Sequence, residues 1–111
     1  KRAFDRAKMI WLESGPLAEP CRTVLWGAGR SGRPWIRWLL AQRHTVVAVI
    51  DPFQGTARQG IPVLEPSALV SIEMDALLVA VGSAAARDQI RVAIRSYRPD
   101  LIEGEHWWAV C

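Results

Sequence analysis

Hydrophobic positions along the chain fall into two patterns that alternate, one typical of helices and one typical of buried strands. Apolar residues recur at helical spacing over 3–13, over 31–43 and from Gly82 to Pro99. Between these segments lie continuous apolar runs at 23–26, 45–50 and 75–81. Apolar runs without alternation indicate strands that are covered on both faces, as in a parallel sheet.

Weaker patterns complete the set of predicted elements. Residues 60–64 predict a short strand at the edge of the sheet because Pro62 removes a backbone donor, and 65–71 predict a brief helix. The tail 106–110 predicts a last strand. In the third long helix, the residues expected to face inward are Ala86, Ile90, Ala93, Ile94 and Tyr97, and those expected outward are Arg87, Arg91, Arg95 and Arg98.

The alternation of strands and helices predicts an α/β fold, namely a three-layer α/β/α domain with about five mostly parallel strands. In such a fold, ligands bind at the carboxyl ends of the strands, where the winding of the sheet reverses. The first helix is expected to end at Ser14-Gly15-Pro16, and Pro20 follows in a linker. We therefore divide the chain into an amphipathic helix with a linker, 1–20, and the α/β domain, 21–111.

A glycine-rich turn follows the first predicted strand and opens the next helix. It reads Gly27-Ala28-Gly29-Arg30-Ser31-Gly32, and Asp51 lies 19 residues beyond its last glycine, at the end of the second strand. A strand before the turn, a helix after it and an acidic residue about 20 positions on are the context of a dinucleotide-binding turn of the Rossmann type. The sequence therefore predicts that Gly27–Gly32 holds phosphate and that Asp51 accepts hydrogen bonds from ribose.

Further residues are candidates for the same edge of the sheet. Gly82 and Ser83 follow the strand 75–81 and open a helix, so they are a second candidate contact for an anion or a sugar, although Ser83 is more often a plain helix cap. Arg30 and Arg33 flank the glycine turn, where each either contacts phosphate or is solvated. Pro34 is compatible with a helix that begins near Ser31.

The sequence offers little catalytic equipment, and we assign no catalytic or metal-binding residue. His44 is expected to be a solvated residue in the turn before the second strand, and His106 has no partner that spacing would bring to it. Cys21 and Cys111 form no metal-ligand spacing and are expected to be reduced thiols.

Composition narrows the classes of partner. Half of the residues are hydrophobic (50%), and the formal net charge of +3 comes from dispersed arginines, so we expect a folded domain that does not bind nucleic acid. No apolar run reaches the length needed to cross a bilayer, which predicts a cytoplasmic chain. The chain begins with Lys1, and we expect it to be part of a longer protein.

Tryptophan is frequent, with 6 residues in 111. Trp35 and Trp38, with Ile36, Leu39 and Leu40, cover more of one helix than a single buried stripe requires. We therefore expect this Trp-rich helix, together with Trp11, to dock onto a second copy of the chain or a neighbouring domain.

Several motifs, taken in order, resemble a known family. They are Val24–Gly32, Val49-Ile50-Asp51-Pro52, Gly60-Ile61-Pro62-Val63, Leu78-Val79-Ala80-Val81-Gly82, Ala86–Arg91 and Glu103-Gly104-Glu105-His106-Trp107-Trp108. Over 22–111 the chain resembles the Rossmann-like domain at the carboxyl end of some bacterial family-two glycosyltransferases. It is less closely similar to the amino-terminal domain of sugar acyltransferases of the sialic acid and bacillosamine type, but has Arg30 or Ser31 where that family usually has histidine.

The resemblance implies an accessory domain that binds a nucleotide or nucleotide-sugar, with Gly27, Gly29, Gly32 and Asp51 as contacts. The ligand is then NAD or a nucleotide of the UDP-sugar type. Two alternatives stay open. In the first alternative, the chain is an NAD-binding fragment of an oxidoreductase. In the second, it is an interaction domain whose ligand site is vestigial.

Overall fold

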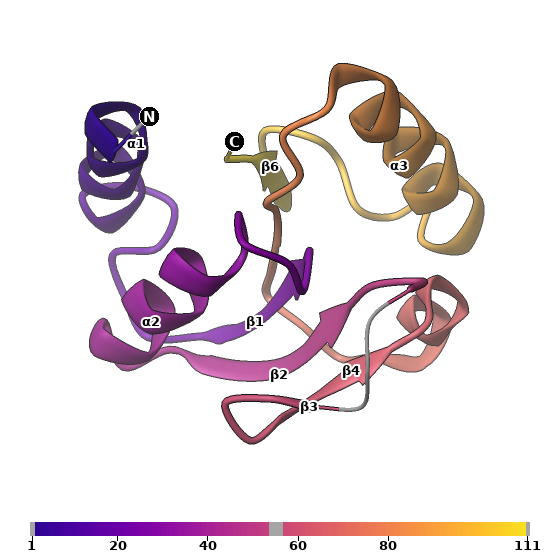
Figure 1. Cartoon of the computed structure of the whole chain (residues 1–111), viewed down its shortest axis with the longest axis horizontal. Coiled ribbons are helices and arrows are strands. Elements are labelled where there is room, and N and C mark those ends of the chain that lie inside the picture. The colour runs from indigo at the N-terminus through magenta and orange to yellow at the C-terminus, as the bar shows by residue number, and fades with distance from the viewer. Residues whose placement is uncertain (1, 54–56, 111) are drawn as a thin grey trace.

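The computed structural model describes residues 2–53 and 57–110, which form one sheet between two helical layers (Figure 1). The helices are α1 (Arg2–Glu13), α2 (Arg33–Ala41), the 3₁₀ helix η1 (Pro66–Ser71) and α3 (Ala84–Tyr97). The strands are β1 (Arg22–Trp26), β2 (Thr45–Ile50), β3 (Ala57–Arg58), β4 (Ile61–Leu64), β5 (Ala76–Val79) and β6 (Trp107–Ala109).

The sheet has the order β3-β4-β2-β1-β5-β6. The pairs β1–β2, β1–β5, β2–β4 and β5–β6 are parallel, and only β3–β4 is antiparallel. From β1 the chain passes through α2 to β2 on one side and later returns to β5 on the other, so the winding reverses between β1 and β5. This confirms the predicted Rossmann-like α/β fold.

Successive residues of the central strands pack into opposite layers, as the continuous apolar runs predicted. Leu25 and Leu78 share a buried cluster with Trp35 of α2. Their chain neighbours Val24 and Leu77 share a second buried cluster with α3 and η1. The sheet is therefore covered on both faces, and the arrangement places the helix that follows β1 and the helix that follows β5 on opposite sides of the sheet.

The prediction that 60–64 lies at the edge of the sheet was wrong. Residues 57–58 form β3, in which Ala57 pairs with Pro62 and Arg58 with Ile61. The two strands are joined by Gln59 and Gly60, both with positive φ (53° and 81°), as a tight two-residue hairpin turn requires. The antiparallel partner was missed because two residues are too few to show a hydrophobic period.

The leading helix and linker contribute to the core of the sheet domain. Leu12 and Leu17 are 0% and 2% exposed and belong to the same buried cluster as Trp35. This packing accounts for Trp35, which the Trp-rich helix was expected to offer to a partner but which is fully buried. Trp38 is half-buried, and its ring packs against that of Trp35 in an edge-to-face arrangement.

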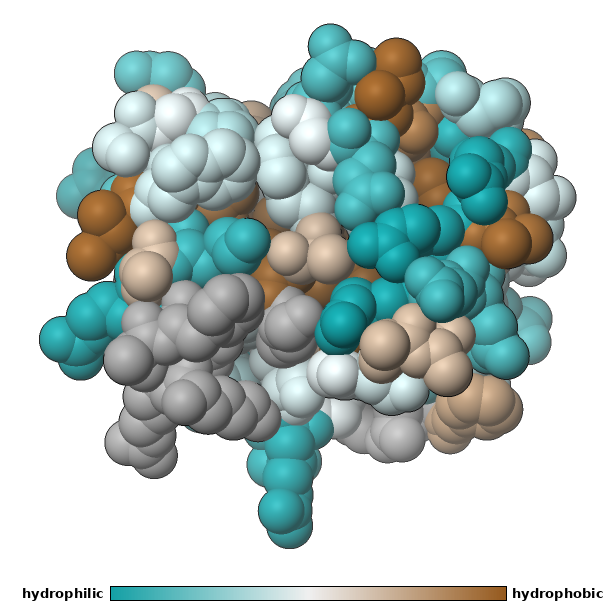
Figure 2. Space-filling model, turned by 90° about the horizontal axis from the view of Figure 1, so that it is seen from above, coloured by the Kyte–Doolittle hydropathy of each residue, from teal (hydrophilic) through white to brown (hydrophobic). Residues whose placement is uncertain are grey.

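Among the described side chains of α1 and α2, the large apolar residues that are exposed are Ile10, Trp11 and Leu40. On the face shown in Figure 2, hydrophobic residues lie in separate places among hydrophilic ones. The described residues on this face therefore do not present one continuous apolar patch to a partner.

Two positions at the end of α3 differ from the amphipathic pattern. Tyr97, expected inward, is exposed, whereas Arg98, expected outward, turns toward η1. Its Nη1 donates to the carbonyl oxygens of Leu69 (3.0 Å) and Ile72 (2.7 Å). Arg98 thus caps the end of η1. The helical period of α3 could not predict this, because η1 is a separate element.

None of the helices in the described residues is long and apolar enough to span a membrane.

Candidate functional site

The glycine turn between β1 and α2 has two positions at which no other residue fits. Gly27 has a φ of 128°, and a Cβ there would lie 2.6 Å from the carbonyl oxygen of Ala80. A Cβ on Gly32 would lie 1.9 Å from the carbonyl oxygen of Gly27. The turn is therefore folded tightly against β5 and against itself, which brings the start of α2 to the end of β1.

The middle of the turn, in contrast, is open. A Cβ added to Gly29 would meet nothing within 4 Å. Among the described residues, the N–H groups of Gly29, Arg30 and Ser31 have no hydrogen-bond acceptor, whereas those of Gly32 and Arg33 donate to the carbonyl oxygen of Gly29. Successive unpartnered N–H groups at a helix start, with space in front of them, are the arrangement that binds an anion.

Asp51 lies directly beside this turn, as predicted from its position after β2. Its Oδ2 accepts a hydrogen bond from the N–H of Ala28 (3.0 Å), and its Oδ1 accepts one from the N–H of Phe53 (2.9 Å). Asp51 therefore holds the glycine turn and the segment after β2 in fixed relation. Each carboxylate oxygen has a second lone pair, so both can still accept a hydroxyl of a ligand.

The charge around the turn favours an anion. The first turn of α2 holds no acidic residue, and Arg30 and Arg33 are both exposed. Pro34 occupies one of the first two positions of α2, where its missing N–H costs no helical hydrogen bond. Arg30 and Arg33 are therefore placed where a bound phosphate would be within their reach.

Gly82 and Ser83 lie at the start of α3, across β1 and β5 from α2. Ser83 is the N-cap, since its Oγ accepts the N–H of Ala86 (3.3 Å), so the plainer of its two predicted roles is the one seen. Gly82 is exposed with open space above its Cα. Arg87, expected to face outward, is half-buried, and its Nη1 donates to the carbonyl oxygens of Val81 (3.2 Å) and Gly82 (3.1 Å).

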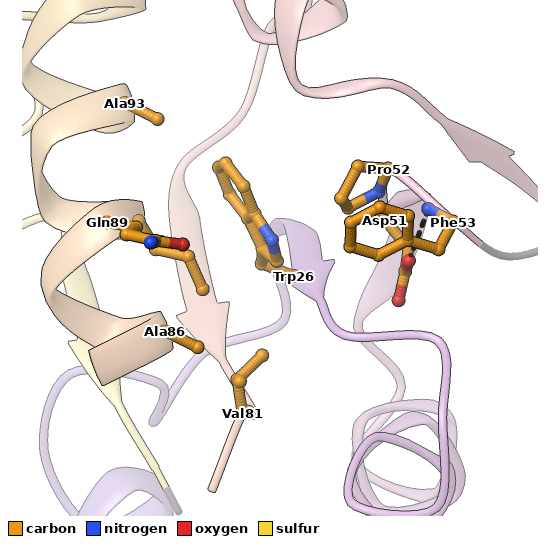
Figure 3. Close-up of a pocket in the computed structure, with 9 residues that line it drawn as sticks. Trp26, Asp51, Pro52, Phe53, Val81, Ala86, Gln89 and Ala93 are labelled. Carbon is orange, nitrogen blue, oxygen red and sulfur yellow. Dashed lines mark hydrogen bonds between the residues drawn. The ribbon is translucent and has the colours of Figure 1, made fainter. Parts of the chain in front are cut away.

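A pocket of about 310 Å³ opens next to Asp51, between the ends of β1 and β2 and the first half of α3 (Figure 3). Its lining includes Trp26 from β1, Phe53 from the segment after β2, and Gln89 and Ile90 from α3. None of these four residues was predicted from the sequence to belong to the site. Two features of the sequence could have indicated these residues. Trp26 comes immediately before the glycine turn, and Gln89 shares a helical face with Ala86 and Ala93.

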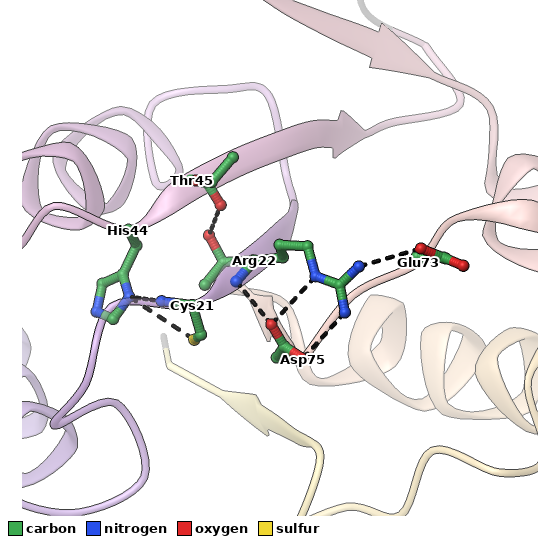
Figure 4. A network of polar contacts seen from close by, with 7 residues as sticks. Cys21, Arg22, His44, Thr45, Glu73 and Asp75 are labelled. Atoms are coloured by element: carbon green, nitrogen blue, oxygen red, sulfur yellow. Dashed lines mark hydrogen bonds and ion pairs between the residues drawn. The ribbon is translucent and has the colours of Figure 1, made fainter.

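The predicted solvated histidine is buried instead. His44 is 4% exposed and lies at the amino ends of the strands, where its Nδ1 accepts the N–H of Cys21 (3.1 Å; Figure 4). The prediction was wrong because the donor that His44 accepts, the N–H of Cys21, lies 23 positions earlier in the chain. Burial lowers the pKa of His44, and the Leu17 backbone only partly offsets this.

Cys21 and His44 do not form a nucleophilic pair, although Sγ and Nδ1 are 3.7 Å apart. Burial, and then the charge of Asp75, raise the pKa of the Cys21 thiol. A reactive pair needs a thiolate beside an imidazolium, and the pKa shifts of both residues oppose it. Cys21 is a free cysteine among the described residues, and Cys111 lies outside them, so the reduced state of both thiols stays a prediction.

The same amino-terminal edge carries an exposed ion-pair network (Figure 4). Arg22 donates from Nε to Asp75 (3.3 Å) and from Nη1 to Glu73 (3.1 Å), and the Arg22 backbone N–H also donates to Asp75 (2.9 Å). The side-chain hydrogen bond from Arg22 is the main cause that lowers the pKa of Asp75. This network joins the starts of β1 and β5 and lies at the opposite edge from the glycine turn.

His106, like His44, holds a backbone N–H. His106 Nδ1 accepts the N–H of Ile102 (2.9 Å) in the turn before β6. In the part of the chain that the structure describes, no three His, Cys, Asp or Glu side chains are grouped as metal ligands would be. The candidate site is the glycine turn with Asp51 and the pocket beside them.

The fold and this edge of the sheet define the class of the protein as a Rossmann-like α/β domain. No protein-family model matches the chain, and searches of curated proteins and of solved structures find no similar protein.

Proposed function

We propose that this chain is a nucleotide-binding domain that holds the phosphates of a nucleoside diphosphate on the glycine turn. The observation that carries the proposal is the set of unpartnered N–H groups at Gly29, Arg30 and Ser31, facing open space at the start of α2. Asp51, fixed beside them, accepts the ribose hydroxyls. Its negative charge favours a ribose without a 2′-phosphate.

The ligand is either a nucleotide-sugar or a dinucleotide such as NAD, which share the same diphosphate and ribose chemistry. The resemblance of 22–111 to the carboxyl-terminal domains of bacterial family-two glycosyltransferases supports the nucleotide-sugar, and an accessory role beside a catalytic domain. The position of Asp51 after β2 is equally suited to NAD. The docking alternative is less favoured, because Trp35 of the Trp-rich helix lies in the core.

Titration of the ¹⁵N-labelled chain with UDP, a UDP-sugar, NAD and NADP tests the proposal by NMR. We expect the amide signals of Gly29, Arg30 and Ser31 to move with UDP or NAD, and NADP to bind more weakly than NAD. If millimolar concentrations of all four ligands leave these amide signals unmoved, the proposal is wrong.

A variant that fills the space in front of the turn gives a second test. Gly29→Val adds a side chain where nothing lies within 4 Å, so the fold is retained and the anion is excluded. We expect nucleotide affinity to fall at least tenfold. The control is Ala41→Val, a β-branched substitution at the opposite, exposed end of α2, which keeps wild-type affinity.

A further inference from the structure

Arginines are dispersed along the whole chain, but acidic residues are not. Residues 20–50 contain five arginines and neither Asp nor Glu. One of the five, Arg22, is held by two carboxylates at the amino-terminal edge of the sheet. The other four lie in α2 or close to its ends, and their exposed side chains have no ion-pair or hydrogen-bond partner among the described residues: Arg30, Arg33, Arg37 and Arg43.

The spacing of these arginines directs positive charge to the outer face of α2. The buried face of the helix is formed by Trp35, Ile36 and Leu39. Arg33 and Arg37 are four positions apart and therefore lie on one face of the helix. Arg37 is two positions from both Trp35 and Leu39, which places it on the opposite side from them. Both guanidinium groups therefore point away from the sheet into solvent.

Exposed apolar side chains accompany this charge on the same layer. α1 packs beside α2 on this side of the sheet, where Leu12 enters the buried cluster that α2 covers (Figure 1). Ile10, Trp11 and Leu40 are nonetheless 55%, 50% and 44% exposed. Arg6, one helical turn before Ile10, is exposed as well. The outer surface of α1 and α2 thus combines arginines with large apolar side chains, namely Arg6, Ile10, Trp11, Arg37, Leu40 and Arg43.

This combination is typical of surfaces that bind an anionic membrane. Anionic headgroups attract basic side chains, while tryptophan and aliphatic side chains enter the boundary between headgroups and acyl chains. Glu13 is the one acidic side chain described on α1 and α2, so the net charge of their described side chains is positive. A bilayer therefore complements both the charge of this surface and its apolar groups.

Other partners fit this surface less well. A nucleic acid would attract the arginines and could stack on Trp11, but it would leave Ile10 and Leu40 without an apolar environment. A stable protein interface buries a contiguous apolar centre surrounded by a polar rim. A fluid bilayer, in contrast, accepts apolar side chains that stand apart from one another among basic ones.

We propose that the outer surface of α1 and α2 docks this domain onto a membrane that contains anionic lipids. Arg37 and Arg43 pair with lipid phosphates, while Ile10, Trp11 and Leu40 enter the headgroup region. The two helices lie along the membrane surface and do not cross it. This goes beyond the proposed function and uses none of the residues that the proposed function assigns to the nucleotide.

Co-sedimentation with lipid vesicles tests the proposal. One set of vesicles consists of phosphatidylcholine alone, and in the other set part of it is replaced by phosphatidylglycerol. We expect the chain to bind the anionic vesicles at least about tenfold more tightly, and this binding to weaken as NaCl is added. The emission difference between the wild type and Trp11→Phe isolates the Trp11 signal, which should shift to shorter wavelength with anionic vesicles.

Two pairs of matched variants separate this surface from the rest of the protein. Arg37→Gln is compared with Arg95→Gln, which removes an exposed arginine of α3 on the other side of the sheet. Leu40→Ser is compared with Val92→Ser, which removes an exposed apolar side chain of α3. Arg37→Gln and Leu40→Ser should each weaken vesicle binding at least about threefold, and the two α3 variants should change it less than about twofold.

Three results would overturn the proposal. They are equal binding to both kinds of vesicle, no binding to either, and equal losses in the α2 and α3 variants. If a single-stranded oligonucleotide binds through Arg37 while anionic vesicles do not bind, the partner is a nucleic acid. If instead the chain self-associates and Leu40→Ser abolishes this, the partner is a second copy. Nucleotide binding by the glycine turn is measured separately, so these results leave the proposed function untouched.

Discussion

Individual residues at the end of β1 are constrained by close backbone approach. Gly27 and Gly32 lie where a Cβ would overlap backbone atoms of Ala80 and Gly27, whereas Gly29 faces open space. The first pair therefore shapes the turn, and Gly29 leaves room for a ligand. Three glycines in one motif have two different physical roles.

This difference predicts opposite effects on stability. Gly32→Ala places a Cβ 1.9 Å from the carbonyl oxygen of Gly27, and we expect it to lower the free energy of unfolding by about 3 kcal/mol or more. Gly29→Ala, the matched control, should change it by less than about 1 kcal/mol. Urea unfolding followed by circular dichroism measures both. Equal losses in the two variants would contradict the assigned roles.

The buried His44 predicts a pH dependence of stability. Burial lowers its pKa in the folded state below the usual 6.5, so the unfolded chain binds the proton more readily. The stability that neutral His44 contributes to the folded state is complete above about pH 7. It is lost as the pH falls below about 6.5, toward the folded-state pKa. The slope that this single group adds reaches at most about 1.4 kcal/mol per pH unit.

His44→Asn checks this assignment, since an asparagine Oδ1 can accept the Cys21 N–H in place of Nδ1. Urea unfolding of the variant between pH 5 and 8 should show a shallower slope than the wild type. His106→Asn, which keeps an acceptor for the N–H of Ile102, is the control for replacing a histidine. A slope that is unchanged in His44→Asn would show that another group causes the acid sensitivity.

At the scale of elements, the ends of the helices decide what lies at the carboxyl edge of the sheet. The chain enters α2 through an open turn with free N–H groups, but it enters α3 through a cap in which Ser83 satisfies the N–H of Ala86. The two helix starts therefore differ in their capacity for an anion. Under the proposed function the phosphates therefore lie at the start of α2, and α3 lines the pocket beside Asp51.

The cap of α3 predicts a measurable loss of stability on substitution. Ser83→Ala removes the acceptor of the Ala86 N–H and should lower the free energy of unfolding by about 1 kcal/mol. Ser83→Asp keeps an acceptor at the cap and should retain most of the wild-type stability. Thermal and urea unfolding of the two variants provide the comparison. Equal stability of Ser83→Ala and the wild type would mean that the cap does not contribute.

At the scale of the whole molecule, the end of α1 and the linker after it are packed as part of the same core as the sheet. Leu12 and Leu17 are buried against the layer that contains Trp35, while Ile10 on the same helix is 55% exposed. The layer over this face of the sheet is therefore built from α1 and α2 together (Figure 1). Folding of the leading helix is expected to be coupled to folding of the domain.

Two substitutions in α1 test this coupling. Leu12→Ala should lower the free energy of unfolding by about 2–4 kcal/mol, because it opens a cavity in the shared core. Ile10→Ala, one turn or less away and half-exposed, should cost less than about 1 kcal/mol. Unfolding is followed by circular dichroism and by tryptophan fluorescence. A Leu12→Ala variant as stable as the wild type would show that α1 folds separately.

Much of the fold could be predicted from the sequence because its signals are local. Helical periods, apolar runs and the spacing of Gly27, Gly32 and Asp51 depend on neighbouring residues, and they correctly predicted the parallel sheet and the edge at which Asp51 meets the turn. Among the strands of the described residues, only β3 was missed, because it is too short to carry a hydrophobic period.

The sequence by itself thus determined the order of elements and the position of the glycine turn, because backbone geometry dictates both within a few residues. The tertiary structure alone decided the burial of His44, the covering of Trp35 by α1 and the joining of Trp26 with Gln89 in one pocket. Each of these depends on contacts between residues far apart in the chain, which form only when the layers pack on the sheet.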